Sequence, residues 1–439
     1  MGETRRALPA DGRVGTHRRR HAPGCGIDEI EAVAARSDRL LIYVASLLRG
    51  LAAGTISVLG AIYLAKRGFD EAAIGLVLSA GLAGVLAGTV YGTYFADRAG
   101  RRRTLVLLAV LSATGAGALV VADALWAAAL AAFVGMLNTQ GSDRGAAQAL
   151  EQAMLPATAS DAERTQVFAR YNAVADIGGA VGALLAALPT LLQARFELTE
   201  VRAYDATIFV YAGLALAAAA LYARLSSSVE RAAAPDSTHA TDHAPTTRRA
   251  VRKFSLLAAV DAMGGGFIGS ALIAYFLYAR FGVEEGALAL LFVAARTMTV
   301  LSHFAAAWLA ARIGLVNTMV FTHIPSSLLL LTLPIAPTFG VAAALFILRE
   351  GLSEMDVPTR QSYLMAIVPP HERSWAAGIS QLARAAGRMV SPLLAGVAMQ
   401  AGALWLPLAV AALVKVTYDV ALWRAFREIK PPEEQASRR

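Results

Sequence analysis

Long runs of apolar residues, separated by short polar stretches, make up most of this chain. Most runs reach the roughly 20 residues that a helix needs to cross a bilayer, and they are apolar all round, whereas a soluble helix keeps a polar face. They therefore predict membrane-spanning helices, which satisfy their backbone groups without water. The twelve predicted spans lie near residues 40–65, 72–95, 104–122, 124–155, 167–192, 206–225, 254–279, 287–311, 316–335, 338–368, 376–400 and 404–425.

Polar segments divide the chain into two apolar halves. An arginine-rich stretch precedes the first span, and a stretch rich in Ser, Thr, His, Ala and Pro separates the sixth span from the seventh. Neither has the apolar content of a packed core, so we expect an all-α polytopic membrane protein of two helical bundles. The expected parts are a mostly disordered tail at 1–39, an N-terminal six-helix bundle at 40–225, a flexible linker at 226–253, a C-terminal six-helix bundle at 254–428 and a tail at 429–439.

The charges are few and lie largely at the ends of the spans. Hydrophobic residues form 56% of the 439 residues and charged residues only 16%, against about 25% in soluble domains. The net charge of +8 comes from arginines in alternate loops, which indicates membrane topology rather than nucleic-acid binding. With an even number of spans, both termini are expected in the cytoplasm.

A polar, basic turn at residues 93–103 joins the second and third predicted spans. It resembles the loop between helices 2 and 3 of the major facilitator superfamily, Gly-x-Leu-Ala-Asp-Arg-x-Gly-Arg-Arg. Thr93 and Phe95 depart from that pattern. The positions that match, and to which the resemblance assigns a role in conformational gating, are Asp97, Arg98, Gly100, Arg101 and Arg102.

A degenerate second copy of this turn occurs in the other half. Arg98 corresponds to Arg312 and Gly100 to Gly314, both at an offset of 214 residues (312 − 98 and 314 − 100). Gly68 and Gly282 keep the same offset (282 − 68). A nearly constant offset over several loops predicts two copies of one structural unit.

The resemblance implies a specific fold and activity. Members of the superfamily pack two pseudo-symmetric six-helix bundles around a central path and transport solutes by alternating access. We therefore expect a monomeric secondary transporter of a small-molecule substrate, coupled to protons. Residues 355–363 resemble a stretch of bacterial efflux permeases, which implies export across a bacterial plasma (inner) membrane.

Motifs for other chemistry are missing from the sequence. The single cysteine, Cys25, excludes a cysteine-based metal cluster. The sequence contains no nucleotide-binding loop, zinc-protease motif or serine-nucleophile motif. We therefore expect no enzyme activity, no cofactor, no bound metal and no nucleic-acid partner.

Charged residues inside the predicted spans are costly and are therefore functional candidates. Either they line an aqueous cavity that binds substrate or protons, or they lock the halves together at the cytoplasmic end. We assign to the cavity Arg49, Asp143, Arg144, Asp261, Arg349, Glu350 and Glu354. We assign to charge pairs at the inner gate Glu151, Asp356, Arg360, Arg384 and Arg388.

Spacing along the helices supports these assignments. Lys415 and Asp419, at i and i+4, are expected to neutralise each other. Polar residues of the fourth and tenth spans recur on one helical face each, namely Gln140, Arg144, Gln148 and Glu151 in one and Arg349, Ser353, Asp356 and Arg360 in the other.

A second function from another class stays open. A membrane receptor or assembly factor could keep this fold without transporting anything, and the degenerate second loop is compatible with it. Embedded charges argue for transport, since a protein without a transport path has less reason to keep them.

Overall fold

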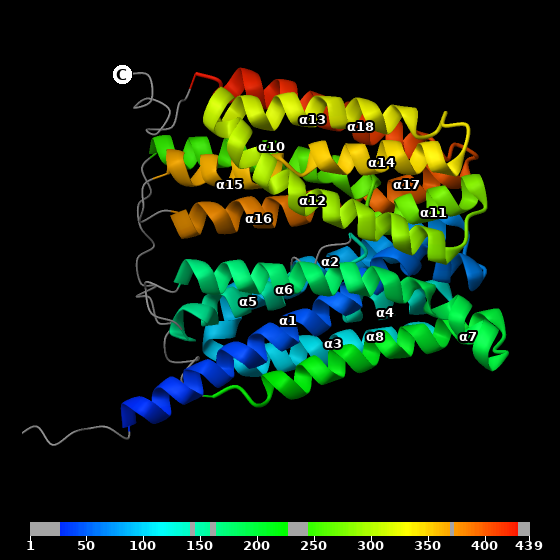
Figure 1. Ribbon diagram of the computed structural model, residues 1–439, viewed down its shortest axis with the longest axis horizontal. Coiled ribbons are helices and arrows are strands. Elements are labelled where there is room, and N and C mark those ends of the chain that lie inside the picture. The colour runs from blue at the N-terminus through cyan, green and yellow to red at the C-terminus, as the bar shows by residue number, and fades with distance from the viewer. Residues whose placement is uncertain (1–26, 141–144, 159–163, 227–244, 369–372, 429–439) are drawn as a thin grey trace, which may run out of the picture.

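The computed structural model describes residues 27–140, 145–158, 164–226, 245–368 and 373–428. Its helices run nearly parallel in two groups, α1–α8 and α10–α18 (Figure 1). The first group comprises α1 (Ile27–Lys66), α2 (Glu71–Ala99), α3 (Arg101–Val120), α4 (Leu125–Gly135), α5 (Ala146–Met154), η1 (Leu155–Thr158), α6 (Arg164–Leu184), η2 (Leu185–Ala187), α7 (Leu188–Phe196) and α8 (Glu200–Tyr222). The second comprises α10 (Pro245–Phe267), α11 (Ser270–Phe281), α12 (Glu285–Ile313), α13 (Leu315–Thr332), α14 (Phe339–Ser353), α15 (Asp356–Ile367), α16 (Arg373–Met389), α17 (Ser391–Gln400) and α18 (Leu406–Phe426).

The described helices make twelve passes. Nine segments are long and apolar enough to cross a membrane on their own. The remaining three passes (12 − 9) are the interrupted pairs α4/α5, α14/α15 and α16/α17. The start of α1 and the end of α18 lie at the same end of the molecule (Figure 1), which we name the terminal end, and the opposite end is the far end.

The fourth pass is not the continuous helix that the sequence predicted. α4 ends at Gly135, and Met136 takes a left-handed conformation with φ 50°. Asn, Thr, Gly, Ser and Asp follow in the sequence, and these residues favour turns over helix interiors. Asn138 Oδ1 accepts from Gln140 N at 3.1 Å, as in such a turn. Gln140, Gln148 and Glu151 therefore do not share one helical face, and Asp143 and Arg144 lie outside the described residues.

Two boundaries also differ from the expected ones. α10 begins at Pro245, so the basic run 248–253 that was expected in the linker is helical. α1 begins at Ile27, within the stretch expected to be disordered. Residues 1–26 of that stretch and 227–244 of the linker lie outside the described residues.

The internal repeat recurs in the backbone. Gly100 and Gly314, which follow α2 and α12, have φ values of 92° and 87°. Gly68 and Gly282, which follow α1 and α11, have φ values of 86° and 63°. Only glycine adopts this region without steric cost, so each pair fulfils the same backbone requirement in its own half.

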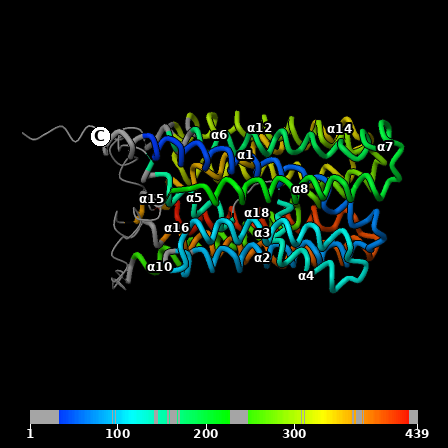
Figure 2. Tube along the Cα trace, turned by 90° about the horizontal axis from the view of Figure 1, so that it is seen from below, coloured from blue at the N-terminus to red at the C-terminus, as the bar shows by residue number. Residues whose placement is uncertain are grey.

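The two halves meet from the middle of the molecule to the far end. α2 packs against α16 and α17, α1 against α11, and α6 against α12, and the last pair lies side by side (Figure 2). Gly75 of α2 and Gly396 of α17 let the backbones touch, because a Cβ on Gly75 would lie 2.3 Å from Pro392 O.

Hydrogen bonds reinforce this contact. Glu71 accepts from Tyr275 at 2.9 Å, and Asp70 from Gln400 at 3.0 Å. In the middle, the interrupted fourth and seventh passes meet, where Ala271 N donates to Thr139 O at 3.2 Å. The hydrogen bonds identified between the halves lie in this middle and far part.

Candidate functional site

One buried carboxylate organises the polar interior of the C-terminal half. Asp261 of α10 is 3% exposed. Its Oδ1 accepts from Lys415 Nζ at 2.9 Å, and its Oδ2 from Arg384 Nη1 at 2.8 Å. Arg360 Nη1 lies 3.4 Å from the same Oδ2 and also binds Asp356. Four passes of the C-terminal bundle, α10, α15, α16 and α18, supply the members of this network.

A histidine that the sequence analysis did not single out completes the network. His323 of α13 lies 2.9 Å from Asp419 through Nδ1 and 3.2 Å from Lys415 Nζ through Nε2. An ammonium group only donates, so Nε2 accepts from Lys415, and Nδ1–H donates a hydrogen bond to the Asp419 carboxylate. The signal in the sequence was an ionisable residue within an apolar span.

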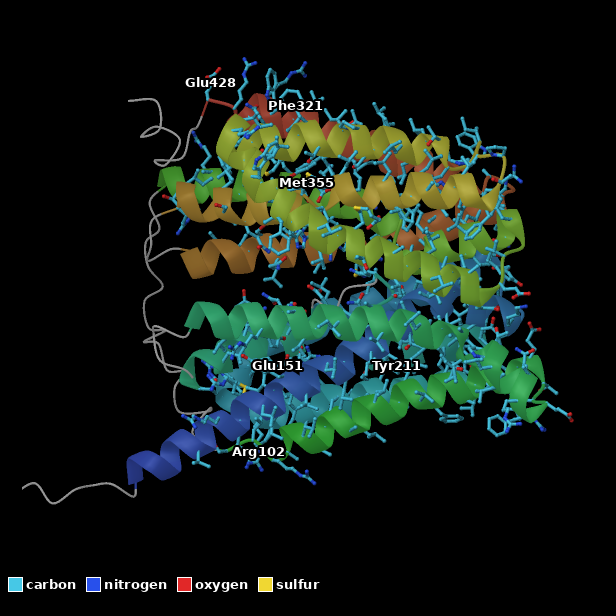
Figure 3. All side chains as sticks on the ribbon, in the orientation of Figure 1. Arg102, Glu151, Tyr211, Phe321, Met355 and Glu428 are labelled. Atoms are coloured by element: carbon cyan, nitrogen blue, oxygen red, sulfur yellow. The ribbon has the colours of Figure 1, made fainter. Side chains whose placement is uncertain are left out.

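The N-terminal half holds a smaller cluster around Glu151, which is fully buried. Arg49 Nη1 lies 2.6 Å from its Oε1. The hydroxyl groups of Tyr171 and Tyr222 each donate to it at 2.6 Å. Glu151 accordingly lies inside the lower group of helices (Figure 3).

These pairings correct two expectations. Lys415 and Asp419 do not neutralise each other, because Lys415 turns to Asp261 and Asp419 to His323. The acids and bases expected to bridge the halves instead find partners within their own half. This holds for Glu151 and for the remaining paired residues, Asp356, Arg360 and Arg384.

A cavity of about 140 Å³ lies in the C-terminal half beside the network. Four of the predicted cavity residues line it, namely Asp261, Arg349, Glu350 and Glu354. Arg349 forms an ion pair with Glu350. Three residues expected at the inner gate line this cavity as well, namely Asp356, Arg384 and Arg388. The two halves of the interrupted tenth pass, α14 and α15, thus place charged side chains around one space.

A larger cavity, of about 520 Å³, lies between the two halves. It falls within the 300–1,000 Å³ of most small-molecule sites. The N-terminal half contributes α1, α5 and α6, and the C-terminal half contributes α12, α15 and α16. Arg296, Glu354 and Val357 line both this cavity and the smaller one. The two spaces are therefore neighbours.

Arg49 does not reach the central cavity. It lines a third space of about 100 Å³ within the N-terminal half, with a mainly apolar wall. Its pairing with Glu151 explains this position.

Two arginines of the basic turn after α2 form hydrogen bonds with other N-terminal passes. Arg101 Nη1 donates to Ala153 O at 3.1 Å, and Arg102 Nη1 to Leu225 O at 2.9 Å. Both bonds tie the turn to the ends of other N-terminal passes. Arg98 is exposed, and the side chain of Asp97 lies outside the described part. No group of three or more His, Cys, Asp or Glu among the described residues could hold a metal ion.

Comparison with known proteins settles the family. A model described as the Major Facilitator Superfamily matches residues 42–347, which is 306 of the 439 residues (347 − 42 + 1). The chain belongs to the major facilitator superfamily. It is thus a multi-pass membrane protein of a transporter family and no enzyme, as the sequence predicted.

Relatives of this superfamily member agree with the fold. An uncharacterized membrane protein of Saccharomyces cerevisiae is 24% identical over 419 residues, which cover 88% of this chain and 94% of the relative. Because this relative comes from yeast, it gives no support to a bacterial membrane or to the efflux branch.

Solved structures match at lower identity. The nucleoside transporter NupG is 15% identical, with a TM-score of 0.65 over 90% of this chain and 99% of that one. A bacterial homolog of the human lysosomal transporter Spinster, inward-facing and occupied, is 14% identical with a TM-score of 0.68 over 89% and 96%. A D-xylose–proton symporter is 15% identical with a TM-score of 0.67 over 89% and 97%. Identities this low establish the fold alone.

Proposed function

We propose that this superfamily member is a secondary transporter that moves a small polar solute by alternating access. The observation that carries this proposal is the central cavity, because both halves line it and one end of the molecule closes it. A site at the interface of two repeats can open to either side when the repeats rock against each other.

The conformation described here corresponds to opening at the terminal end. The inter-half hydrogen bonds lie in the middle and at the far end, whereas Gln148, Gln152 and Gln361 extend the cavity wall towards the terminal end. Arginines concentrate at the terminal end, which makes it the cytoplasmic side under the positive-inside rule. This supports an inward-facing state with both termini in the cytoplasm.

We further propose protons as the coupling ion. A D-xylose–proton symporter has a similar fold. A carboxylate in a cavity wall can take up and release protons. Glu354 is the best-placed carboxylate, because it lines both cavities. Glu350 faces the smaller cavity beside Arg349.

Flux measurements on reconstituted protein test the proposal. Proteoliposomes with a pH-sensitive dye inside are screened with sugars, nucleosides, amino acids and organic acids under an imposed pH gradient. We expect at least one solute to move with protons, and Glu354→Gln to keep solute movement while reducing proton movement several-fold. Glu200→Gln, at the exposed far end, is the control. Solute movement without proton movement in the wild type refutes the coupling.

The alternative is a receptor or assembly factor without transport. It requires that no solute crosses the membrane in either direction. Solute flux in the screen therefore excludes it, and the sign of that flux also gives the direction of transport.

A further inference from the structure

One face of α12 presents an unpaired cation to the central cavity. Arg296, Thr299 and His303 follow at spacings of three and four residues, so they lie on one helical face, and all three line the cavity. Within the part of the chain that the structure describes, no hydrogen bond or ion pair reaches the Arg296 guanidinium. A half-buried guanidinium in a cavity wall is expected to have a partner, which leaves room for a ligand.

Two further nitrogen atoms nearby have no partner. Arg349 is 7% exposed, and its Nε has no hydrogen-bond partner among the described residues. Its ion pair with Glu350 uses Nη1, so Nε–H stays available. The buried Nε2 of His303 has no partner either. Buried polar atoms are rarely left in this state, and these line the two cavities that meet at Arg296.

The acidic groups of the same walls are already engaged. Asp261 faces Lys415 and Arg384, and Glu350 faces Arg349. Asp176 and Glu354, which line the central cavity, each have an interaction of their own. Among the described residues that line the two cavities, Arg296 is the arginine or lysine for which no hydrogen bond or ion pair is found.

Five carboxamide side chains also line the central cavity, beside small and apolar residues such as Ala53 and Val357. Each carboxamide offers both donors and acceptors, and no Phe, Tyr or Trp lines this cavity among the described residues. An apolar solute would leave these groups without hydrogen-bond partners. The free-energy penalty of those unpaired groups would exceed the gain from burying the apolar surface of the solute. The carboxamides are those of Gln148, Gln152, Asn172, Gln361 and Gln381.

We infer that the transported solute is small, rich in hydroxyl or amide groups, and carries a carboxylate or phosphate that Arg296 recognises. This rests on the proposed transport function, since it names the solute class of the same cavity. A guanidinium binds either anion through two parallel N–H donors. Arg349 Nε and His303 Nε2 supply further donors to the same ligand.

The reactivity of an introduced cysteine tests the charge of the cavity, and this test does not require that the substrate be known. Cys25 is the only cysteine, so Cys25→Ser with Gln381→Cys places one thiol in the cavity wall. Anionic and cationic methanethiosulfonate reagents are compared in detergent. We expect Arg296→Gln to lower the ratio of anionic to cationic reaction rates about tenfold, because one unit charge favours one reagent and opposes the other. Arg280→Gln, at the far end of α11, should leave the ratio unchanged. A ratio that Arg296→Gln does not change overturns the inference.

Protection by matched solutes tests the ligand class in the same variants. Gluconate is compared with sorbitol, and glycerol 3-phosphate with glycerol, as inhibitors of thiol modification. We expect at least one acid to slow the reaction several-fold more than its neutral counterpart, and Arg296→Gln to abolish that difference. Equal effects within both pairs, including no effect, overturn the inference. Neither measurement depends on transport, so failure here is distinct from an absence of flux in proteoliposomes.

Discussion

Asp261 joins three cations that have few other anions within reach. Lys415, Arg384 and Arg360 all lie within 3.4 Å of its carboxylate oxygens. Removing one member of a buried ion network leaves uncompensated charge in a medium of low dielectric constant. We expect Asp261→Ala to reduce the free energy of unfolding by about 3–5 kcal/mol, measured by denaturant unfolding in detergent.

A surface pair provides the control for that prediction. Asp123 lies 2.8 Å from Arg67, but its side chain is 94% exposed. Asp123→Ala should cost less than about 1 kcal/mol. The double variant Asp261→Asn with Lys415→Met should recover part of the loss, since it removes one charge of each sign. Equal losses in Asp261→Ala and Asp123→Ala would contradict a structural role for the network.

At the residue scale, the sequence identified several of the buried charged residues, but it did not predict which of them form pairs. Asp261, Arg360 and Arg384 stood out as charges within apolar spans. Helical spacing suggested that Lys415 would pair with Asp419, but tertiary packing brings Asp261 and His323 closer to them. His323 went unnoticed because a single histidine produces no pattern along the chain.

Glycines allow α1 and α6 to pack closely. A Cβ on Gly182 would lie 2.2 Å from Leu51 O, and one on Gly178 would lie 2.6 Å from Leu47 O. The glycine-rich run on the fifth pass is therefore explained by helix packing, as small residues commonly are in membrane bundles.

A matched pair of variants on α6 tests this packing. We expect Gly182→Ala to destabilise the protein by about 1–3 kcal/mol, because the added methyl group meets rigid backbone. Gly179 has no atom within 4 Å of an added Cβ, so Gly179→Ala should be neutral or slightly stabilising. Thermal unfolding of both variants in one detergent decides the point, and equal shifts would refute the packing explanation.

Helix interruptions were the element-scale feature that periodicity could not reveal. The run 124–155 is apolar enough to read as one span, yet it contains the break between α4 and α5. Turn-forming residues at 138–143 carried the signal. Whether they break a helix depends on partners for the freed backbone groups, and the seventh pass supplies one through Ala271. Such a partner is remote in sequence.

For the whole molecule, contact between α2 and α17 holds the far end closed. Gly75 and Gly396 lie at its centre, where an added Cβ would overlap backbone atoms of the other half. We expect Gly75→Ala to shift the population towards opening at the far end, since a penalty of about 1.4 kcal/mol changes an equilibrium tenfold.

The shift can be measured at a buried position of the same interface. Ser79 is 8% exposed and contacts Leu393. In a Cys25→Ser, Ser79→Cys background, Gly75→Ala should raise thiol reactivity about tenfold. Gly286→Ala, where an added Cβ meets no atom within 4 Å, should not. Equal reactivity in the two variants would show that this contact does not control opening.

The overall fold was predictable because it depends on span length and on duplication. The offset of 214 residues that relates Gly100 to Gly314 reappears as matching positive φ values in both halves. The central cavity was less predictable, because its wall combines at most a few residues from each of six helices in both halves of the chain. Arg296 lies within the predicted span 287–311, and nothing in the sequence distinguishes it from the other embedded charges; its place between two cavities does.

The bond between Ala271 N and Thr139 O has a consequence for the state not seen here. When the halves part on the far side, both groups lose this partner, because Ala271 lies in the first turn of α11 and Thr139 lies outside a helix. An orphaned peptide group in hydrocarbon costs several kcal/mol. Water must therefore enter the seam between the interrupted fourth and seventh passes as it opens, so hydration there becomes part of the barrier that separates the two orientations.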